Sequence, residues 1–203
     1  PPRSTLFPYT TLFRSGGRTI GKGVAEKLGI PCYDHEVIEQ LVERSGFAAD
    51  YVKSQSEYAP NGSLFVNALN AGNFHGLSNQ DKLWTMQRQI IEELGEKENC
   101  VIVGRCADYA LADEPHCLNI FIRSNMDDRI KRISERLNVP ENKAKDIIKK
   151  KDKERSSYYN YYTSKKWGDA RSYDLCLNTS QISVEDSIEL ILKYRECMRS
   201  HNK

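Results

Sequence analysis

A glycine-rich turn that runs directly into an amphipathic helix constrains this chain more than any other feature. The stretch 16–29 begins with two glycines, which allow a tight turn with several N–H groups close together. Three apolar residues then lie four apart on one helical face: Ile20, Val24 and Leu28. Gly29 is suited to end the helix, and a strand-like run follows it. This order predicts a phosphate-binding loop at the start of an α/β domain, although a tight turn that caps an ordinary helix explains the stretch equally well on its own.

Short apolar runs alternate with helical patterns along the rest of the chain. We predict strands at 30–34, 100–104, 118–122 and 173–178, and helices at 35–44, 81–96, 126–137, 140–148 and 183–198. Ser183, with Asp186 three residues later, is expected to cap the last helix. The alternation predicts an α/β fold with a parallel sheet and helices on both faces. Two polar excursions interrupt it, at about 47–79 and about 149–170.

Residues 1–15 resemble, at every position, the in-frame translation of a common sequencing adapter. We interpret them as a non-native scar, exclude them from the fold, and expect one domain over residues 16–203. On this interpretation a native first strand and the first half of the glycine loop are missing. The alternative is a genuine β-hairpin, because threonine, phenylalanine and tyrosine are frequent in the segment. The β-prone residues 10–13 are also able to imitate the lost strand.

The bulk composition restricts the partners that we expect. A net charge of +2 over 203 residues produces no global field that calls for nucleic acid or a membrane. One basic run at 149–155 lies beside several tyrosines, which leaves nucleic-acid binding as an alternative, but a single run in a nearly neutral chain argues against it. There is no run of transmembrane length and no signal-peptide pattern. We therefore expect a cytoplasmic protein without membrane partners.

The six cysteines show neither C-x-x-C pairs nor metal-ligand spacing with the histidines. Two of them, Cys100 and Cys176, lie in predicted strands. We expect reduced, buried thiols and no metal ion bound by the protein alone.

Five motifs occur in an order that resembles the cytidylate kinase-like family of P-loop nucleoside monophosphate kinases. They are Gly-Gly-Arg-Thr-Ile-Gly-Lys at 16–22, Tyr-Asp at 33–34, Val-Gly-Arg-Cys-Ala-Asp-Tyr at 103–109, Trp-Gly-Asp at 167–169, and Tyr-Asp-Leu-Cys-Leu-Asn-Thr-Ser at 173–180. The resemblance covers residues 16–198. It implies a three-layer P-loop sandwich with an acceptor-binding insertion and a lid, which match the two excursions. It also implies ATP and Mg²⁺ as cofactors and CMP or dCMP as the acceptor.

The glycine loop is where the resemblance places the donor nucleotide. The residues expected to bind its phosphates, mainly through backbone N–H groups, are Ser15, Gly16, Gly17, Arg18 and Thr19, and the Thr19 hydroxyl is expected near the metal. Gly17 occupies the position of the lysine in the standard loop G-x-x-x-x-G-K-[ST]. Either Arg18 takes over the catalytic role of that lysine, or catalysis is weak. The Gly-Gly-Arg form is usual in this subfamily, which favours substitution.

Three residues are expected to bind the acceptor. Arg105 follows a strand that ends in glycine, a position where α/β sheets bind ligands, and the resemblance assigns it the acceptor phosphate. Asp108 is a second candidate, with the role of a helix-dipole partner as its alternative. Asp34 is expected to hold metal-bound water near the acceptor, and its alternative is the N-cap of the next helix.

Further cations are expected from the lid side. Arg129 matches an arginine that reaches phosphate in related enzymes, whereas Arg132 is interpreted as part of a solvated face. Arg155 is expected to act in catalysis and Lys151 to bind the nucleotide, although charge runs are usually solvated helix faces. The neighbouring tyrosines are expected to pack the lid on the core rather than to stack on a base: Tyr158, Tyr159, Tyr161 and Tyr162.

Three functions remain open from the residues alone. The first is phosphoryl transfer from ATP to CMP or dCMP. The second is a kinase for another small acceptor, because Asp34 is followed by His-Glu where relatives have Ser/Thr-Gly. The third is a non-catalytic nucleotide-binding module, which the missing lysine favours.

Overall fold

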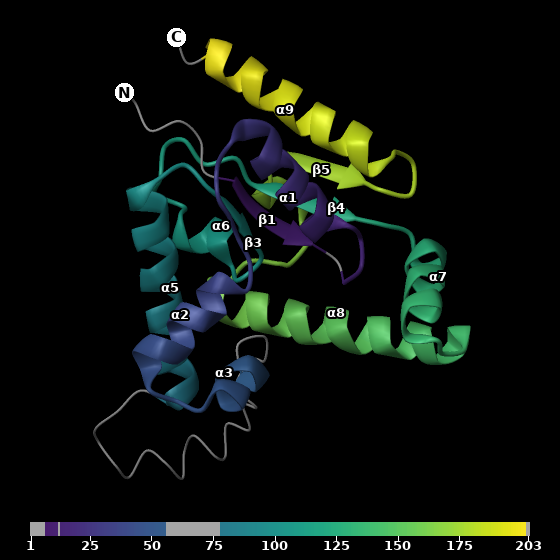
Figure 1. The fold of residues 1–203 in the computed structure, drawn as a ribbon, viewed down its shortest axis with the longest axis horizontal. Coiled ribbons are helices and arrows are strands. Elements are labelled where there is room, and N and C mark those ends of the chain that lie inside the picture. Colours follow the sequence, from purple (N-terminus) through teal and green to yellow (C-terminus); the bar gives the residue numbers. More distant parts are fainter. Residues whose placement is uncertain (1–6, 12, 56–77, 202–203) are drawn as a thin grey trace.

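The computed structural model describes residues 7–11, 13–55 and 78–201 and contains a sheet of five parallel strands (Figure 1). The strands are β1 (Phe7–Thr11), β2 (Cys32–Tyr33), β3 (Val101–Val103), β4 (Ile120–Arg123) and β5 (Leu175–Asn178), in the order β2-β3-β1-β4-β5. All pairs of neighbouring strands are parallel. The predicted α/β class with a parallel sheet is confirmed.

The helices alternate with these strands along the chain. They are α1 (Gly17–Leu28), α2 (Glu36–Ser45), α3 (Ala49–Gln55), α5 (Asn79–Lys97), α6 (Ala107–Ala110), α7 (Met126–Leu137), α8 (Glu141–Thr163) and α9 (Val184–His201), with a short 3₁₀ helix at Ala170–Ser172. The predicted cap of the last helix is present, because the Asp186 N–H donates to the Ser183 Oγ over 2.9 Å.

Helices cover both faces of the sheet because successive strand residues point to opposite sides. Val101 is buried in a cluster with Ile20 of α1 and Ile191 of α9. The next residue, Ile102, is buried on the other face in a cluster with Ile90 of α5. The three-layer arrangement therefore follows from the alternation along β3.

The α1 and α9 helices approach each other closely on the first face. A Cβ added at Gly23 of α1 would lie only 2.3 Å from the Cδ1 of Ile188 on α9. Glycine at this position allows the branched side chain of Ile188 to pack directly against the α1 backbone.

The central position in the sheet belongs to β1. Phe7 pairs with Val101 of β3, and Tyr9 pairs with Ile120 of β4. Excluding residues 1–15 from the fold is therefore wrong for residues 7–11, and β1 shares residues 10 and 11 with the segment 10–13 that was expected to imitate a strand. Their origin as a translated adapter stays a prediction.

The two excursions differ in what the structure describes. Residues 56–77 of the predicted insertion lie outside the described residues. The predicted lid is largely helical, because α8 continues without a break from Glu141 through the basic run to Thr163. The α7 and α8 helices pack on each other through an apolar cluster of Ile130, Ile133, Ala144 and Ile148.

The cysteines are all free thiols, but not all are buried. Cys100 and Cys106 are buried, whereas Cys176 and Cys197 are exposed. The expectation that Cys176 is buried is wrong because its side chain points to the exposed face of the edge strand β5. Among the described residues, no helix is both long and apolar enough to cross a membrane.

Candidate active site

A cavity of about 630 Å³ lies at the carboxyl ends of β1 and β3. Its walls come from the loop between β1 and α1, the end of β2, the turn after β3, the α7 and α8 helices, and the segment between β5 and α9. The connection from β1 to β2 runs toward one edge of the sheet, and the connection from β3 to β4 runs toward the opposite edge. Crevices of this kind, where the strand order reverses, are the usual ligand sites of parallel sheets.

The loop that precedes α1 is fixed by hydrogen bonds from the neighbouring strands. The Ser15 Oγ donates to the carbonyl of Ile122 over 3.0 Å, and the Ser15 carbonyl accepts from the Thr179 Oγ1 over 2.7 Å. Gly16, with φ of +90°, is the N-cap of α1 and brings no side chain to cover the first-turn N–H groups. Ser15, Gly16, Gly17, Arg18 and Thr19 all line the cavity, so the predicted donor loop faces it as a unit.

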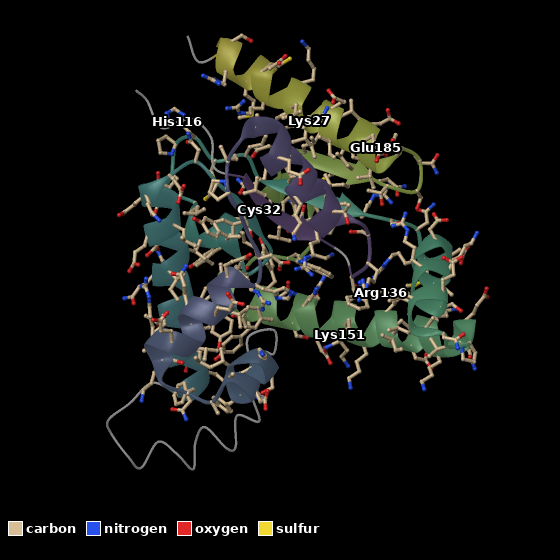
Figure 2. The ribbon with its side chains drawn as sticks, in the orientation of Figure 1. Lys27, Cys32, His116, Arg136, Lys151 and Glu185 are labelled. Atoms are coloured by element: carbon tan, nitrogen blue, oxygen red, sulfur yellow. The ribbon has the colours of Figure 1, made fainter. Side chains whose placement is uncertain are left out.

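Arginine supplies the positive charge of the cavity. Six line it, and we call them the arginine cluster: Arg14, Arg18, Arg105, Arg132, Arg136 and Arg155. Among the described residues that line it there is one carboxylate, Asp34, and no lysine. Figure 2 shows Arg136 on the side of α7 that faces the sheet. The excess of cations makes the cavity suited to a ligand with several negative charges.

Asp34 bridges the end of β2 and the donor loop. Its Oδ2 lies 2.5 Å from the Arg18 Nε, in an ion pair without hydrogen-bond alignment. The alternative role of Asp34 as a helix cap is wrong, because His35 is the N-cap residue of α2. The Asp34 N–H instead donates to the Glu36 Oε2 over 2.8 Å. Asp34 is therefore directed at the cavity rather than at α2.

The turn after β3 has an unusual backbone. Gly104, Arg105 and Cys106 have consecutive positive φ angles of 75°, 60° and 54°. Left-handed conformations are costly for residues with a Cβ, and such strain concentrates at functional sites. The carbonyl of Arg105 accepts from the buried Gln87 Nε2 over 3.2 Å, which holds the turn in place. This turn places Arg105 in the cavity wall.

Asp108 is not a lining residue of the cavity, contrary to its predicted contact with the substrate. It is buried at the start of α6 and accepts a 2.6 Å hydrogen bond from the Tyr159 hydroxyl. Burial, followed by the negative charge of Asp108, raises the pKa of Tyr159, which keeps the hydroxyl protonated as a donor. Because Tyr159 lines the cavity, Asp108 positions a wall residue instead of touching the ligand itself.

Arg129 is likewise absent from the cavity wall, so its predicted catalytic role does not fit the structure. It is 3% exposed, and its Nη2 lies 2.6 Å from the Oδ2 of Asp152 on α8. Its Nε donates to the carbonyl of Phe13 over 2.8 Å, and the Phe13 N–H donates to Asp152 over 3.0 Å. We call these three residues the Phe13 clasp. Arg129 is a structural link between the donor loop and the α7–α8 pair.

Two arginines farther along α7 reach the cavity instead. Arg132 donates from its Nη1 to the carbonyl of Arg14 over 3.3 Å, and Arg136 lines the wall one turn later. The four-residue spacing of these two arginines places them on the same face of α7, and this spacing is visible in the sequence. Lys151, predicted to bind nucleotide, does not line the cavity and pairs with Glu154 at 2.9 Å (Figure 2).

The tyrosines of α8 behave largely as the packing interpretation predicts. Tyr158 and Tyr159 are buried and form a cluster with Cys106, while Tyr162 stacks on Trp84 with ring centroids 4.5 Å apart. Tyr161 differs, because it is 52% exposed. The cluster places Arg155, which precedes these tyrosines on α8, at the cavity.

The cavity fits a magnesium–nucleotide complex better than a metal ion bound by protein alone. The described residues contain no group of three or more metal-ligating side chains. Asp34 and the Thr19 hydroxyl line the wall near the donor loop. Magnesium usually keeps several waters and binds through one or two protein oxygens together with substrate phosphates, which this donor set permits.

Comparisons with known proteins agree with this architecture. The sequence profile of the cytidylate kinase-like family matches residues 10–181. An uncharacterized protein from Eubacterium ventriosum is similar in structure, with 28% identity, a TM-score of 0.72, and coverage of 96% of this chain and 99% of that chain. No protein of curated function matches the sequence.

Two kinases share the fold at lower identity. Shikimate kinase from Bacteroides thetaiotaomicron has 16% identity and a TM-score of 0.58, with coverage of 95% of this chain and 98% of that chain. A gluconokinase from Sinorhizobium meliloti has 14% identity and a TM-score of 0.52, with coverage of 98% and 95%. These two likenesses show the α/β fold of the P-loop kinases.

Proposed function

The chain belongs to the cytidylate kinase-like family, and we propose that it transfers a phosphoryl group from Mg·ATP to a nucleoside monophosphate, CMP or dCMP. Family membership makes the chain a nucleotide-dependent phosphotransferase of the P-loop kinase fold. The identities of the acceptor and the donor are part of this proposal. The proposed binding partners of the chain are small nucleotides, rather than nucleic acid or a membrane.

The arginine cluster is the observation that carries this proposal. Phosphoryl transfer requires two polyanions to lie in line, and Mg·ATP and a monophosphate each bring about two negative charges at neutral pH. Six arginines against one carboxylate in a single cavity offset that repulsion. Because the cations are fixed on several elements before the ligands arrive, the site needs little reorganisation as charge develops on the transferring group.

Each wall of the cavity has its own task in this proposal. The first-turn N–H groups of α1 and the side chain of Thr19 would bind the donor phosphates, and Asp34 would hold the magnesium ion through a bound water, which would neutralise charge on those phosphates. Arg105, on the strained turn after β3, binds the acceptor phosphate. Arg155 on α8, with Arg132 and Arg136 on α7, neutralises the transferring group from the opposite side.

A substrate panel tests the proposal. The purified chain is incubated with Mg·ATP and each nucleoside monophosphate, and ADP release is measured with a coupled assay. We expect turnover that is fastest with CMP or dCMP and at least tenfold lower for Arg105→Gln. A matched control is Arg123→Gln, which removes an exposed arginine at the end of β4 that does not line the cavity. Absence of ADP formation with every acceptor would contradict the proposal.

The lysine-free cavity supports a second candidate, a nucleotide-binding module without catalysis. This candidate predicts ATP binding by calorimetry with no turnover, and an ATP affinity that Arg105→Ala leaves nearly unchanged. Extending the panel to sugar acids and other small alcohols separates both candidates from a kinase with a different acceptor. The His-Glu pair after Asp34 is the sequence feature that favours this last possibility.

A further inference from the structure

The turn after β3 carries backbone strain at two residues that have a Cβ. Arg105 and Cys106 have φ angles of 60° and 54°, in the left-handed region that only glycine adopts without cost. The Cys106 carbonyl accepts from the Ala110 N–H over 3.0 Å, which ties this residue to the helix that follows. A strained backbone persists only where its surroundings hold it, so the neighbouring Arg105 requires a restraint from outside the turn.

Gln87 of α5 supplies a restraint of this kind. The residue is 1% exposed, and its Nε2 donates to the Arg105 carbonyl over 3.2 Å and to the Tyr158 hydroxyl over 3.1 Å. Since a backbone carbonyl is only an acceptor, the amide nitrogen has to be the atom that faces it. Both hydrogens of this nitrogen have an acceptor, which prevents rotation of the amide. The α5 and α8 helices together therefore hold the backbone of Arg105.

The amide of Gln87 contributes little to the stability of the core in which it lies. Its neighbours on the same face of α5, Leu83 and Ile90, are apolar and buried. The Gln87 Oε1 is also buried, and it accepts no hydrogen bond within the part of the chain that the structure describes. A buried acceptor without a donor is costly, and an apolar side chain of similar length avoids this cost. The position of Arg105, rather than core packing, accounts for a polar residue here.

We propose that Gln87 is a positioning residue, which holds the strained turn so that Arg105 presents its guanidinium to the acceptor phosphate. Gln87 does not belong to the described residues that line the cavity, so it acts through Arg105 without contact to the ligand. The contact between Arg105 and the acceptor rests on the proposed function. The restraint on the turn rests on the two hydrogen bonds of the Gln87 amide.

Three variants of the full chain test this role. Gln87→Met keeps the length of the side chain and removes both donors. Gln89→Met is the same change at an exposed position of α5 and is the matched control. Tyr158→Phe removes one acceptor of the Gln87 amide and leaves the bond to the Arg105 carbonyl in place.

Three measurements are made on each variant. Steady-state kinetics give the KM for CMP and the KM for ATP, and circular dichroism melts give Tm. Hydrogen–deuterium exchange of the peptide 104–111 reports on the turn and requires neither an acceptor nor turnover, because exchange of backbone amides follows local opening.

For Gln87→Met we expect the KM for CMP to rise at least tenfold, the KM for ATP to change less than about threefold, and Tm to stay within about 4 °C of wild type. The peptide 104–111 should exchange at least tenfold faster in this variant. Gln89→Met should match wild type in every measurement. In Tyr158→Phe the exchange of this peptide should stay within about threefold of wild type, because the Arg105 carbonyl keeps its donor.

Wild-type exchange of the peptide 104–111 in Gln87→Met would overturn the inference. An equal rise in the KM for both substrates would also overturn it, as would faster exchange in Tyr158→Phe that equals the change in Gln87→Met. Faster exchange in Gln87→Met alone, with no turnover by the wild-type chain, would support the restraint on the turn and refute the proposed kinase activity. Normal turnover of the wild-type chain, with an unchanged KM for CMP in Gln87→Met, would do the reverse.

Discussion

Replacing Asp152 with leucine tests whether the Phe13 clasp holds the donor loop to α8. The change removes the carboxylate that pairs with Arg129 at 2.6 Å and accepts the Phe13 N–H over 3.0 Å. Arg129, only 3% exposed, keeps a single described acceptor, the carbonyl of Phe13. The variant therefore leaves a buried guanidinium without its counter-ion.

The burial of the pair determines the size of the effect. Removing one partner of a buried ion pair costs about 3–5 kcal/mol of unfolding free energy. The Asp152 side chain is 19% exposed, so water screens the pair to some extent, and we expect a loss near the lower end, about 3 kcal/mol. In a chain of this length that loss lowers Tm by roughly 6–12 °C.

Urea unfolding followed by circular dichroism measures this loss, and a double-mutant cycle identifies its source. Arg129→Met combined with Asp152→Leu removes both charges, so we expect the double variant to be more stable than Asp152→Leu alone. Asp146→Leu, an identical change at an exposed position of α8, should stay within about 0.5 kcal/mol of wild type. A loss below about 1 kcal/mol in Asp152→Leu, or simple additivity in the cycle, would refute the reasoning.

Two further variations probe packing and thiol chemistry. Gly23→Ala should lower the unfolding free energy by about 1 kcal/mol, because overpacking against Ile188 exceeds the gain in helix propensity. Adding Ile188→Val removes the crowded Cδ1 and should restore most of the lost free energy, as measured by urea unfolding. A wild-type value for Gly23→Ala alone would argue against close contact between α1 and α9. Maleimide labelling of the native protein should modify the exposed Cys176 well before Cys106, because burial raises the pKa of the Cys106 thiol well above its usual range. Peptide mapping measures the labelling of each thiol, and equal labelling of both would contradict this order.

Local patterns predict the elements of this fold well where hydrophobic periodicity is strong. The bounds of α7 agree at both ends because its apolar residues recur at helical spacing between clear breaks. Such patterns do not predict the position of β1 in the sheet, because that position depends on backbone pairing with strands about 90 to 110 residues away. A β-prone composition indicates a strand, but it does not indicate the position of that strand in the order of the sheet.

The candidate site shows the same division between local and distant information. The glycine loop and Arg105 follow from motifs that are contiguous in sequence, and both line the cavity. Arg129 and Arg132 are three apart on one helix, and spacing alone does not distinguish them. The position of Asp152, on the next helix, decides that Arg129 is buried and that Arg132 reaches the loop.

The central place of β1 also determines when the chain is able to fold during its synthesis. The β1 strand leaves the ribosome before both of its neighbours, and the second of them, β4, ends at Arg123, about 110 residues later. At about 5–20 residues per second, β1 waits roughly 5 to 20 seconds before both of its edges are paired. The Phe13 clasp closes later still, after α8 has been made. Through this interval the strand that belongs in the middle of the sheet has at least one open edge, which other nascent chains and chaperones are able to bind.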